Sequence, residues 1–255
     1  MHHFMHIPKD CVLVCALVLT GFGCSTVDAV RRSDEGLVGC WAFDEGRGEV
    51  AGDASGNAND GRIQHCKWVT QDFGTALHFD GENSYVAIPA LPALDGSDEL
   101  TIEVWVFWEG VGRYPNILTG GAWNPGGFLL FVCDEQCMFR MGKPGKEPWE
   151  LRKTWQETGA LVLRPIELGR WYHLATTFKR PDITTYVNGE PVACGRWNFP
   201  VGQTGKIHLG KWDLDESERP SHYGLIDELR IYKRALGADE IKAGYEMTRT
   251  GRIHP

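Results

Sequence analysis

The sequence lacks the features of two large classes of protein. Its longest apolar run spans residues 11–22, which is shorter than the roughly 20 residues that a membrane-spanning helix needs. It also lacks an excess of basic residues, because 26 Lys and Arg stand against 34 Asp and Glu, for a net charge of −8. Since no basic stripe is present, we expect no nucleic-acid partner and no direct attraction to anionic membrane surfaces.

The motifs of common enzyme classes are missing as well. The sequence has no Gly-x-Ser-x-Gly, no His-Glu-x-x-His, no phosphate-binding loop and no His and Cys at zinc-site spacing. A laminarinase-type glycosidase would carry Glu-x-Asp-x-x-Glu or Glu-x-Asp-x-Glu on one strand, with its carboxylates on one face. The most similar run, Asp213-Leu-Asp-Glu-Ser-Glu218, does not begin with Glu, and Glu103 has no carboxylate two residues away. The sequence therefore predicts no catalytic residues.

Long helical patterns are scarce, and short alternating apolar runs take their place. With 31 Gly and 13 Pro, turn signals recur about every ten residues, as is typical of a β-sandwich. We expect one all-β domain over residues 36–247 with a single short helix at Ala238–Glu246. Residues 74–88 are predicted to form one hairpin that turns at Asp80-Gly81. The main expected strands are Val38–Phe43, Leu100–Trp108, Trp171–Phe178, Ile183–Val192 and Leu225–Tyr232.

Residues 1–24 are typical of a signal peptide, because a short apolar core is followed by small residues. The end of this segment, Leu19-Thr-Gly-Phe-Gly-Cys24, resembles a bacterial lipobox, although Gly21 stands where Leu is usual. We expect export to the periplasm or the cell surface, with a lipid on Cys24 as the only membrane contact. A buried N-terminal strand is the alternative for this run. Residues 25–35 are predicted to form a polar tether and residues 248–255 a tail.

Five cysteines follow residue 24, and an odd number leaves at least one free thiol. Cys133 and Cys137 are predicted to form a disulfide at the neck of a hairpin, because strands are expected on both sides of them. Such a small closed loop would add little stability. The alternative is that both are unpaired thiols.

A series of short motifs occurs in the order found in LamG-like (concanavalin A-like) jelly-roll domains, and the sequence resembles this family over roughly residues 36–246. The resemblance implies a sandwich of two curved antiparallel sheets whose first and last strands pair side by side. It also implies carbohydrate or protein binding, often beside a bound calcium, without specifying one ligand. The motifs are Gly39-Cys-Trp-Ala-Phe-Asp-Glu45, Asp53-Ala-Ser-Gly-Asn57, Asn59-Asp-Gly61, Ala76-Leu-His-Phe-Asp-Gly81, Thr101-Ile-Glu-Val-Trp-Val106, Trp171-Tyr-His-Leu-Ala175, Tyr186-Val-Asn-Gly189 and Ile226-Asp-Glu-Leu-Arg-Ile-Tyr232.

Three aspartates are candidate ligands of a structural calcium, the only cofactor that we expect. Asp44, Asp80 and Asp227 stand at strand ends, and in related jelly rolls acids near the paired first and last strands hold calcium, which prefers oxygen ligands. Alternation places Asp227 on the apolar face of its strand with Leu229 and Ile231. An acid there is costly unless it is paired or metal-bound. The alternative is that Asp227 accepts backbone N–H groups or pairs with an Arg.

The loop Asp53–Asn59 is a second candidate for a cation, because oxygen-bearing side chains recur at every other position. The alternative for this loop is a turn whose Asx side chains cap backbone N–H groups. It lacks the Gly and the distal Glu of a helix-loop-helix calcium site. Only the placement of its side chains can separate the two hypotheses.

Ten Trp residues are many for a chain of this length. Trp123, Trp155 and Trp197 lie in loop-like contexts and are the predicted ligand-binding residues, because an exposed Trp ring can stack against the C–H groups of a sugar. The alternative is that these rings seal loops onto the sandwich. Three others lie within strand patterns and are expected in the core: Trp41, Trp105 and Trp171.

The sequence therefore favours a non-catalytic binding module whose partner is a glycan or a surface protein. Two alternatives remain open at this point. One is a glycan-active hydrolase or lyase with an unfamiliar site, which the missing carboxylate pair disfavours. The other is a structural envelope lipoprotein with no small ligand.

Overall fold

The computed structural model describes residues 34–111, 116–121, 126–133, 136–142, 159–163, 165–212 and 222–250. The expected signal peptide with Cys24, most of the tether, Trp123, Trp155 and the acidic loop 213–218 lie outside these residues. Within the described ranges, no helix has both the length and the apolar character needed to cross a membrane.

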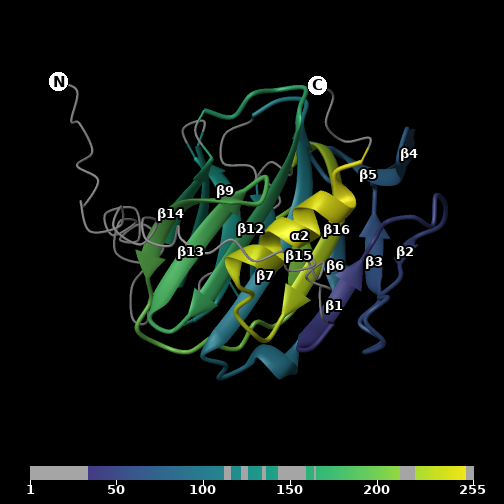
Figure 1. Ribbon diagram of the computed structural model, residues 1–255. Helices are drawn as coiled ribbons and strands as arrows, with labels where there is room; N and C mark the ends of the chain where they lie inside the picture. Colours follow the sequence, from purple (N-terminus) through teal and green to yellow (C-terminus); the bar gives the residue numbers. More distant parts are fainter. Residues whose placement is uncertain are drawn as a thin grey trace, which may run out of the picture.

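Two antiparallel sheets form the molecule, as the sequence predicts (Figure 1). In the first, sheet A, neighbouring strands follow the order β14-β13-β12-β7-β16-β5-β4, and β1 pairs with β16 beside this path. Its strands are β1 (Leu37–Trp41), β4 (Lys67–Gln71), β5 (Gly74–Asp80), β7 (Glu99–Trp108), β12 (Trp171–Lys179), β13 (Asp182–Val187), β14 (Glu190–Arg196) and β16 (Tyr223–Tyr232).

The second sheet, sheet B, has the order β11-β10-β9-β8-β15-β6-β3-β2. Its strands are β2 (Val50–Ala51), β3 (Gly61–Gln64), β6 (Tyr85–Ile88), β8 (Asn116–Gly120), β9 (Phe128–Cys133), β10 (Gln136–Met141), β11 (Gly159–Leu163) and β15 (Ile207–Leu209). A short 3₁₀ helix, η2 (Pro92–Leu94), follows β6. The order of strands in both sheets differs from their order in the chain, and half of the described pairings join strands that are not consecutive in the sequence.

The core lies between the two sheets, where the inward side chain of every second residue meets its counterparts from the other sheet. The strand β7 shows the principle, because Ile102, Val104 and Val106 belong to this core while Glu103 and Trp105 do not. The largest fully buried side chains include Trp41, Phe79, Trp108, Phe128, Phe139 and Phe178. The expected burial of Trp41, Trp105 and Trp171 is confirmed.

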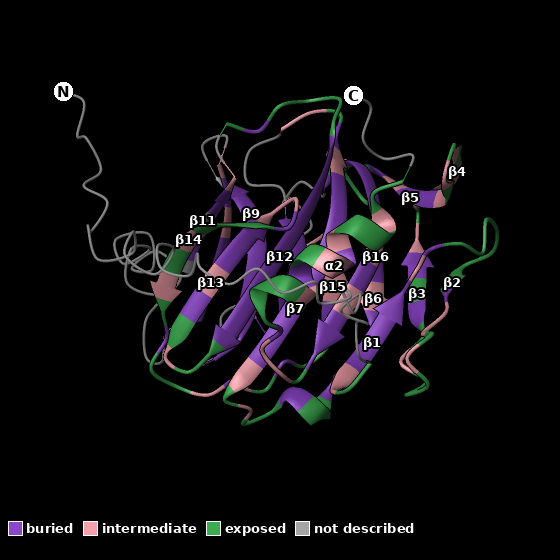
Figure 2. Cartoon of the chain, viewed as in Figure 1, coloured by how far each residue is buried: buried purple, intermediate pink, exposed green. Residues whose placement is uncertain are grey.

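The outer face of sheet A is covered by the C-terminal helix α2 (Ala238–Thr248), which lies across it (Figures 1 and 2). Trp105 packs beneath the helix, stacked on Tyr245 at 5.8 Å between ring centroids, and its Nε1 donates to Oγ1 of Thr248 at 2.7 Å. Beside Trp105, the buried Glu103 and His173 lie 3.5 Å apart. This helix explains why a face that carries charged residues is nevertheless buried.

The first and last strands pair as the resemblance implies, with Cys40 opposite Arg230 and Trp41 opposite Leu229. The hairpin between β13 and β14 also forms at Asn188-Gly189, whose φ angles of 51° and 80° are both positive. A turn with two consecutive residues in the left-handed region favours Asn-Gly, and this is why the turn can be predicted from the sequence.

The predicted hairpin over residues 74–88 is wrong, because β5 belongs to sheet A and β6 to sheet B. The chain crosses between the sheets at residues 81–84. Oδ1 of Asp80 accepts the backbone N–H groups of Glu82, Asn83 and Ser84 at 2.9–3.1 Å and so fixes this crossing. A capped crossing and a hairpin begin with the same Asp-Gly signal, and only the long-range pairing distinguishes them.

Candidate functional site

The loop Asp53–Asp60 is held together by one carboxylate. Oδ1 of Asp53 accepts the N–H groups of Cys40 and Ser55, both at 2.9 Å, and Oδ2 accepts Asn59 N–H at 2.9 Å and Ser55 Oγ at 2.8 Å. Partial burial raises the pKa of Asp53, but the hydrogen bonds from Ser55 and from these backbone groups bring it below its usual value. The carboxylate oxygens therefore already have donors, as the turn-capping alternative requires.

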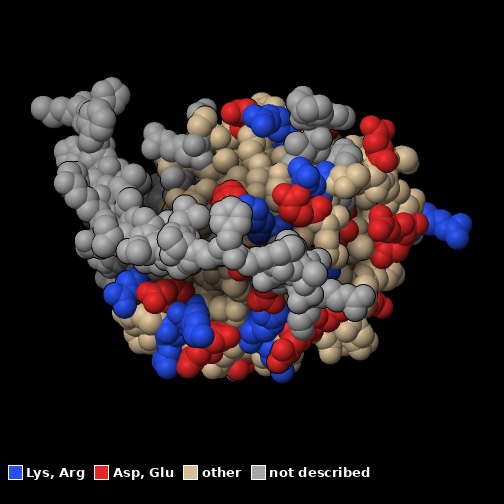
Figure 3. Space-filling model, in the orientation of Figure 1, with Lys and Arg blue, Asp and Glu red and all other residues tan. Residues whose placement is uncertain are grey.

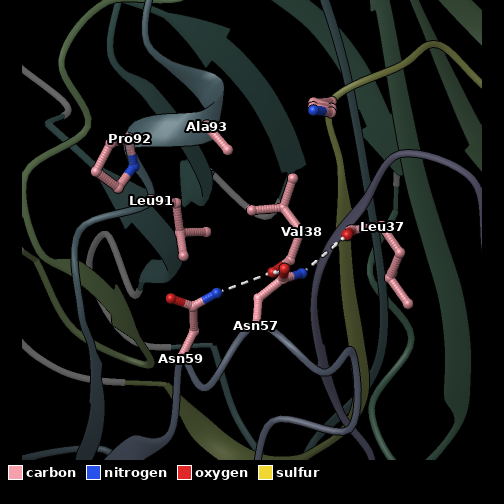
Figure 4. Close-up of a pocket in the computed structure, with 8 residues that line it drawn as sticks. Leu37, Val38, Asn57, Asn59, Leu91, Pro92 and Ala93 are labelled. Atoms are coloured by element: carbon pink, nitrogen blue, oxygen red, sulfur yellow. Dashed lines mark hydrogen bonds between the residues drawn. The ribbon is translucent and has the colours of Figure 1, made fainter.

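A pocket of about 210 Å³ lies between this loop, β1 and η2 (Figure 4). Ser55 Oγ, Asn57 Nδ2 and Asn59 Nδ2 all donate to the carbonyl of Val38, at 3.2, 3.1 and 2.9 Å. Unpaired backbone groups on an edge strand favour aggregation, and such side chains cover them. The pocket has no aromatic lining and is smaller than the roughly 300 Å³ usual for ligand sites, so we assign it to the protection of β1. It is lined by Leu37, Val38, Asn57, Asn59, Leu91, Pro92, Ala93 and Lys233.

The three aspartates predicted to share a calcium lie apart. Oδ1 of the exposed Asp44 is 2.9 Å from the position that a Cβ would take on Gly74, at the start of β5. Asp80 is at the other end of that strand, about 20 Å away at the usual rise per residue. Hydrogen bonds from Glu82, Asn83 and Ser84 outweigh partial burial and lower the pKa of Asp80 to about 2. Across the described ranges, no group of three or more His, Cys, Asp or Glu could hold a metal ion.

Asp227 is fully buried at a bulge in β16, where the register with β7 shifts between Asp227 and Arg230. Its Oδ1 accepts the N–H of Glu228 at 2.9 Å, and Glu228 has a φ of 51°. Because of this bulge, the prediction that Asp227 shares a face of the strand with Leu229 and Ile231 is wrong. Asp227 is in register with Trp105 beneath α2, while Leu229 and Ile231 point into the core. An extra residue in a strand reverses the alternation beyond it.

We expect Asp227→Ala to lower the free energy of unfolding by about 1–3 kcal/mol, because the partly buried N–H of Glu228 loses its acceptor. The loss should be equal in calcium and in chelator if the carboxylate serves the bulge alone. Melting curves of both proteins in both conditions measure this. Asp44→Ala, at an exposed position, is the matched control and should melt like the wild type. A loss seen only with calcium would contradict the bulge role and support the predicted calcium site.

The predicted disulfide is not formed. Cys137 is a free thiol that lies opposite Val132 in the β9–β10 pair, and Cys133 lies opposite Gln136. Cys137 is fully buried in the core, where desolvation raises the pKa of its thiol above the usual range. The prediction relied on the short loop between the two cysteines, but the register of β9 and β10 places neither cysteine opposite the other.

Of the three predicted ligand-binding tryptophans, the described one is buried. Trp197 is 2% exposed, its ring lies 5.3 Å from that of Phe199, and its Nε1 donates to the carbonyl of Pro200 at 3.3 Å. A ring in this position has no exposed face for a sugar. Its placement fits the alternative, a ring that seals a loop onto the sandwich.

One in-register row of side chains crosses the outer face of sheet B, and we call it the sheet B row. Residues in register point to the same side of a sheet. The neighbours of this row on each strand, such as Ile63, Val86 and Leu118, are in the core, so the row faces outward. From the β3 side it consists of Arg62, Ala87, His208, Thr119, Leu129 and Arg140.

The β3 end of the row is accessible. Arg62 is exposed and His208 is half-buried, whereas Thr119, Leu129 and Arg140 are buried. Tyr85 lies on the same face, half-buried, with its ring 5.8 Å from the ring of His208 and 5.0 Å from Lys211 Nζ. We call this accessible group the Tyr85 patch; it comprises Arg62, Gln64, Tyr85, Ala87, His208 and Lys211.

No Asp or Glu occurs in any described strand of sheet B. The strand acids are all in sheet A, and on the face seen in Figure 3 the visible acidic and basic side chains are intermixed. The described strands of sheet B therefore supply no carboxylate pair of the kind that glycosidases use. The acids of sheet A are Asp80, Glu99, Glu103, Asp182, Glu190, Asp227 and Glu228.

A family comparison agrees with this fold, since residues 80–242 match a laminin G-like family described as the concanavalin A-like lectin/glucanases superfamily. The chain belongs to this superfamily. No relative was found among the curated proteins. Members of one superfold serve many functions, so the membership fixes the architecture and leaves the ligand to the residues of the site.

Solved structures of the same fold include both binding domains and enzymes. Domain 4 of AbnA, a GH43 extracellular arabinanase from Geobacillus stearothermophilus solved with arabinotriose, is 22% identical with a TM-score of 0.62, over 81% of this chain and 96% of that one. The binding domain of Paraclostridial Mosquitocidal Protein 1 is 17% identical with a TM-score of 0.61, over 84% of this chain and 52% of that one. Trypanosoma rangeli sialidase is 17% identical with a TM-score of 0.62, over 85% of this chain and 33% of that one. This chain thus spans about half of the mosquitocidal-protein binding domain and a third of the sialidase.

Proposed function

We propose that the chain is a non-catalytic module that binds glycans at the Tyr85 patch. The observation that carries this proposal is a half-exposed aromatic ring on an open sheet face, surrounded by Arg62, Gln64, His208 and Lys211. An aromatic face accommodates the C–H groups of a sugar, and the surrounding donors can bind its hydroxyl groups. The absence of carboxylates from the described strands of sheet B supports binding without hydrolysis.

The structural similarity to a domain solved with arabinotriose is consistent with a glycan ligand. A surface protein is the other partner that the sequence allows. The patch favours a glycan, because it has one tyrosine ring among polar and charged side chains rather than the apolar centre of a protein interface.

Tyr85→Ala is expected to weaken glycan binding at least about tenfold, equivalent to about 1.4 kcal/mol, because it removes the only Tyr, Phe or Trp ring of the patch. Binding of the full chain to immobilised arabinan, dextran and polygalacturonate, compared with the variant, measures this. Tyr223→Ala is the matched control, since Tyr223 is 43% exposed at the start of β16 in sheet A. Undiminished binding by Tyr85→Ala would contradict the proposed site, and release of reducing ends would favour the hydrolase alternative.

A further inference from the structure

We propose that the Tyr85 patch selects acidic saccharides, which it binds through their carboxylate or sulfate groups. This inference rests on the proposed function and names the ligand class of the same site. It follows from the distribution of charge between the two sheets and from the cations that surround the ring.

The two cations nearest to solvent in the patch have no acidic partner among the described residues, which do not include the acidic loop 213–218. Arg62 is exposed on β3, and Lys211 is half-buried with its Nζ over the Tyr85 ring. Neither forms an ion pair with a carboxylate in the described part of the chain. Several other cations of the described ranges do form such pairs, whereas the exposed Arg47, Lys67, Lys206 and Lys233, like Arg62 and Lys211, do not. The paired cations include Arg170, Arg180, Arg196, Arg230, Arg234, Lys179 and Lys242. An unpaired guanidinium on an open face can bind an oxyanion in bidentate fashion, and an ammonium adds a point charge.

The distribution of charge over the rest of the chain supports an acidic ligand for these two cations. The chain has a net charge of −8, so an acidic ligand would be repelled from most of its surface. Sheet B differs because none of its described strands carries an acid, whereas the strands of sheet A carry several. Its outer face is therefore the part of the described sandwich on which a negative ligand meets cations without neighbouring strand carboxylates.

The spacing also suits a saccharide. Arg62 and His208 are in one row, two strands apart, with only the methyl group of Ala87 between them. Two strand spacings are about 9.5 Å, which is long enough for a sugar ring to lie between the two side chains. Tyr85, two residues before Ala87 on β6, and Lys211, just after the end of β15, then border the same sugar ring. Arg140, at the far end of the row, is buried and has no part in this proposal.

The test compares the full chain with Arg62→Gln and with Lys211→Gln, by affinity electrophoresis in polygalacturonate, dextran sulfate and neutral arabinan. We expect each variant to lose about five- to tenfold in affinity for an acidic probe and to bind arabinan as the wild type does. Raising the salt should weaken acidic binding alone, because exposed charges are screened. The two acidic probes distinguish carboxylate from sulfate as the recognised group.

Arg196→Gln is the matched control, because Arg196 is also an exposed arginine on a strand, but in sheet A, and pairs weakly with Asp182 at 3.6 Å. It should bind like the wild type. Acidic binding that is equally reduced by Arg196→Gln, or unchanged in Arg62→Gln and Lys211→Gln, overturns the proposal. Tyr85-dependent binding of arabinan without preference for acidic probes overturns the ligand class alone and leaves the proposed function intact. Binding to none of the probes overturns both.

Discussion

A chain that ends at residue 224 is expected to have no cooperative fold. This cut removes nearly all of β16, which lies between β7 and β5 in sheet A and also pairs with β1. Three strands would then expose backbone groups that β16 now satisfies. An unpaired buried N–H or C=O costs as much as a lost hydrogen bond, and an open edge invites aggregation.

The side chains of β16 lead to the same expectation. Five apolar side chains in the removed part of β16 are buried. At about 1.5–3 kcal/mol for each buried side chain, their loss amounts to about 8–15 kcal/mol, which equals the whole stability of an ordinary domain. They are Leu225, Ile226, Leu229, Ile231 and Tyr232.

Far-UV circular dichroism and a thermal melt measure the effect of this truncation. A chain that ends at residue 250 keeps every described strand and α2, and it should melt like the full chain. If the chain ending at 224 were soluble and melted cooperatively at an unchanged temperature, the central position of β16 would be contradicted.

Trp41→Ala is the point substitution for which we expect the largest loss, about 3–5 kcal/mol of unfolding free energy. Trp41 is fully buried, and its ring fills the space beside Gly39, where an added Cβ would lie 2.1 Å from Cη2. Its Nε1 donates to the carbonyl of Asn59 at 3.0 Å. The ring therefore links β1 to the loop that covers its edge, so its removal leaves a cavity and frees that loop.

Two further variants separate the contributions of Trp41, each measured by denaturant unfolding. Trp41→Phe keeps most of the ring and should lose less than Trp41→Ala, since it removes mainly the hydrogen bond, worth about 1 kcal/mol. Trp68→Ala is the matched control, because Trp68 makes a similar bond to the carbonyl of Gly48 at 3.0 Å but is only half-buried on β4. Equal losses at positions 41 and 68 would show that burial is not the cause.

The sequence by itself determined the local part of the fold. Strict alternation over residues 100–108 fixed which side chains of β7 enter the core, and Asn188-Gly189 fixed the turn between β13 and β14. The expected helix at Ala238–Glu246 corresponds to α2, and the expected pairing of the first and last strands is present. The alternation and the turn depend on the two-residue period of a strand and on local turn chemistry, both of which are visible in neighbouring residues. The pairing of the first and last strands is a long-range feature, which the family resemblance implied.

Only the tertiary structure decided which segments meet. The sheet to which β6 belongs, the register that places Cys137 opposite Val132, and the bulge at Asp227 all depend on partners far away in the chain. The Tyr85 patch has the same origin, because β3, β6 and the segment from β15 to Lys211 contribute its side chains, and β3 lacks a strong strand pattern of its own. Alternation indicates that a side chain faces away from the core, but long-range pairing alone determines which neighbours share that face.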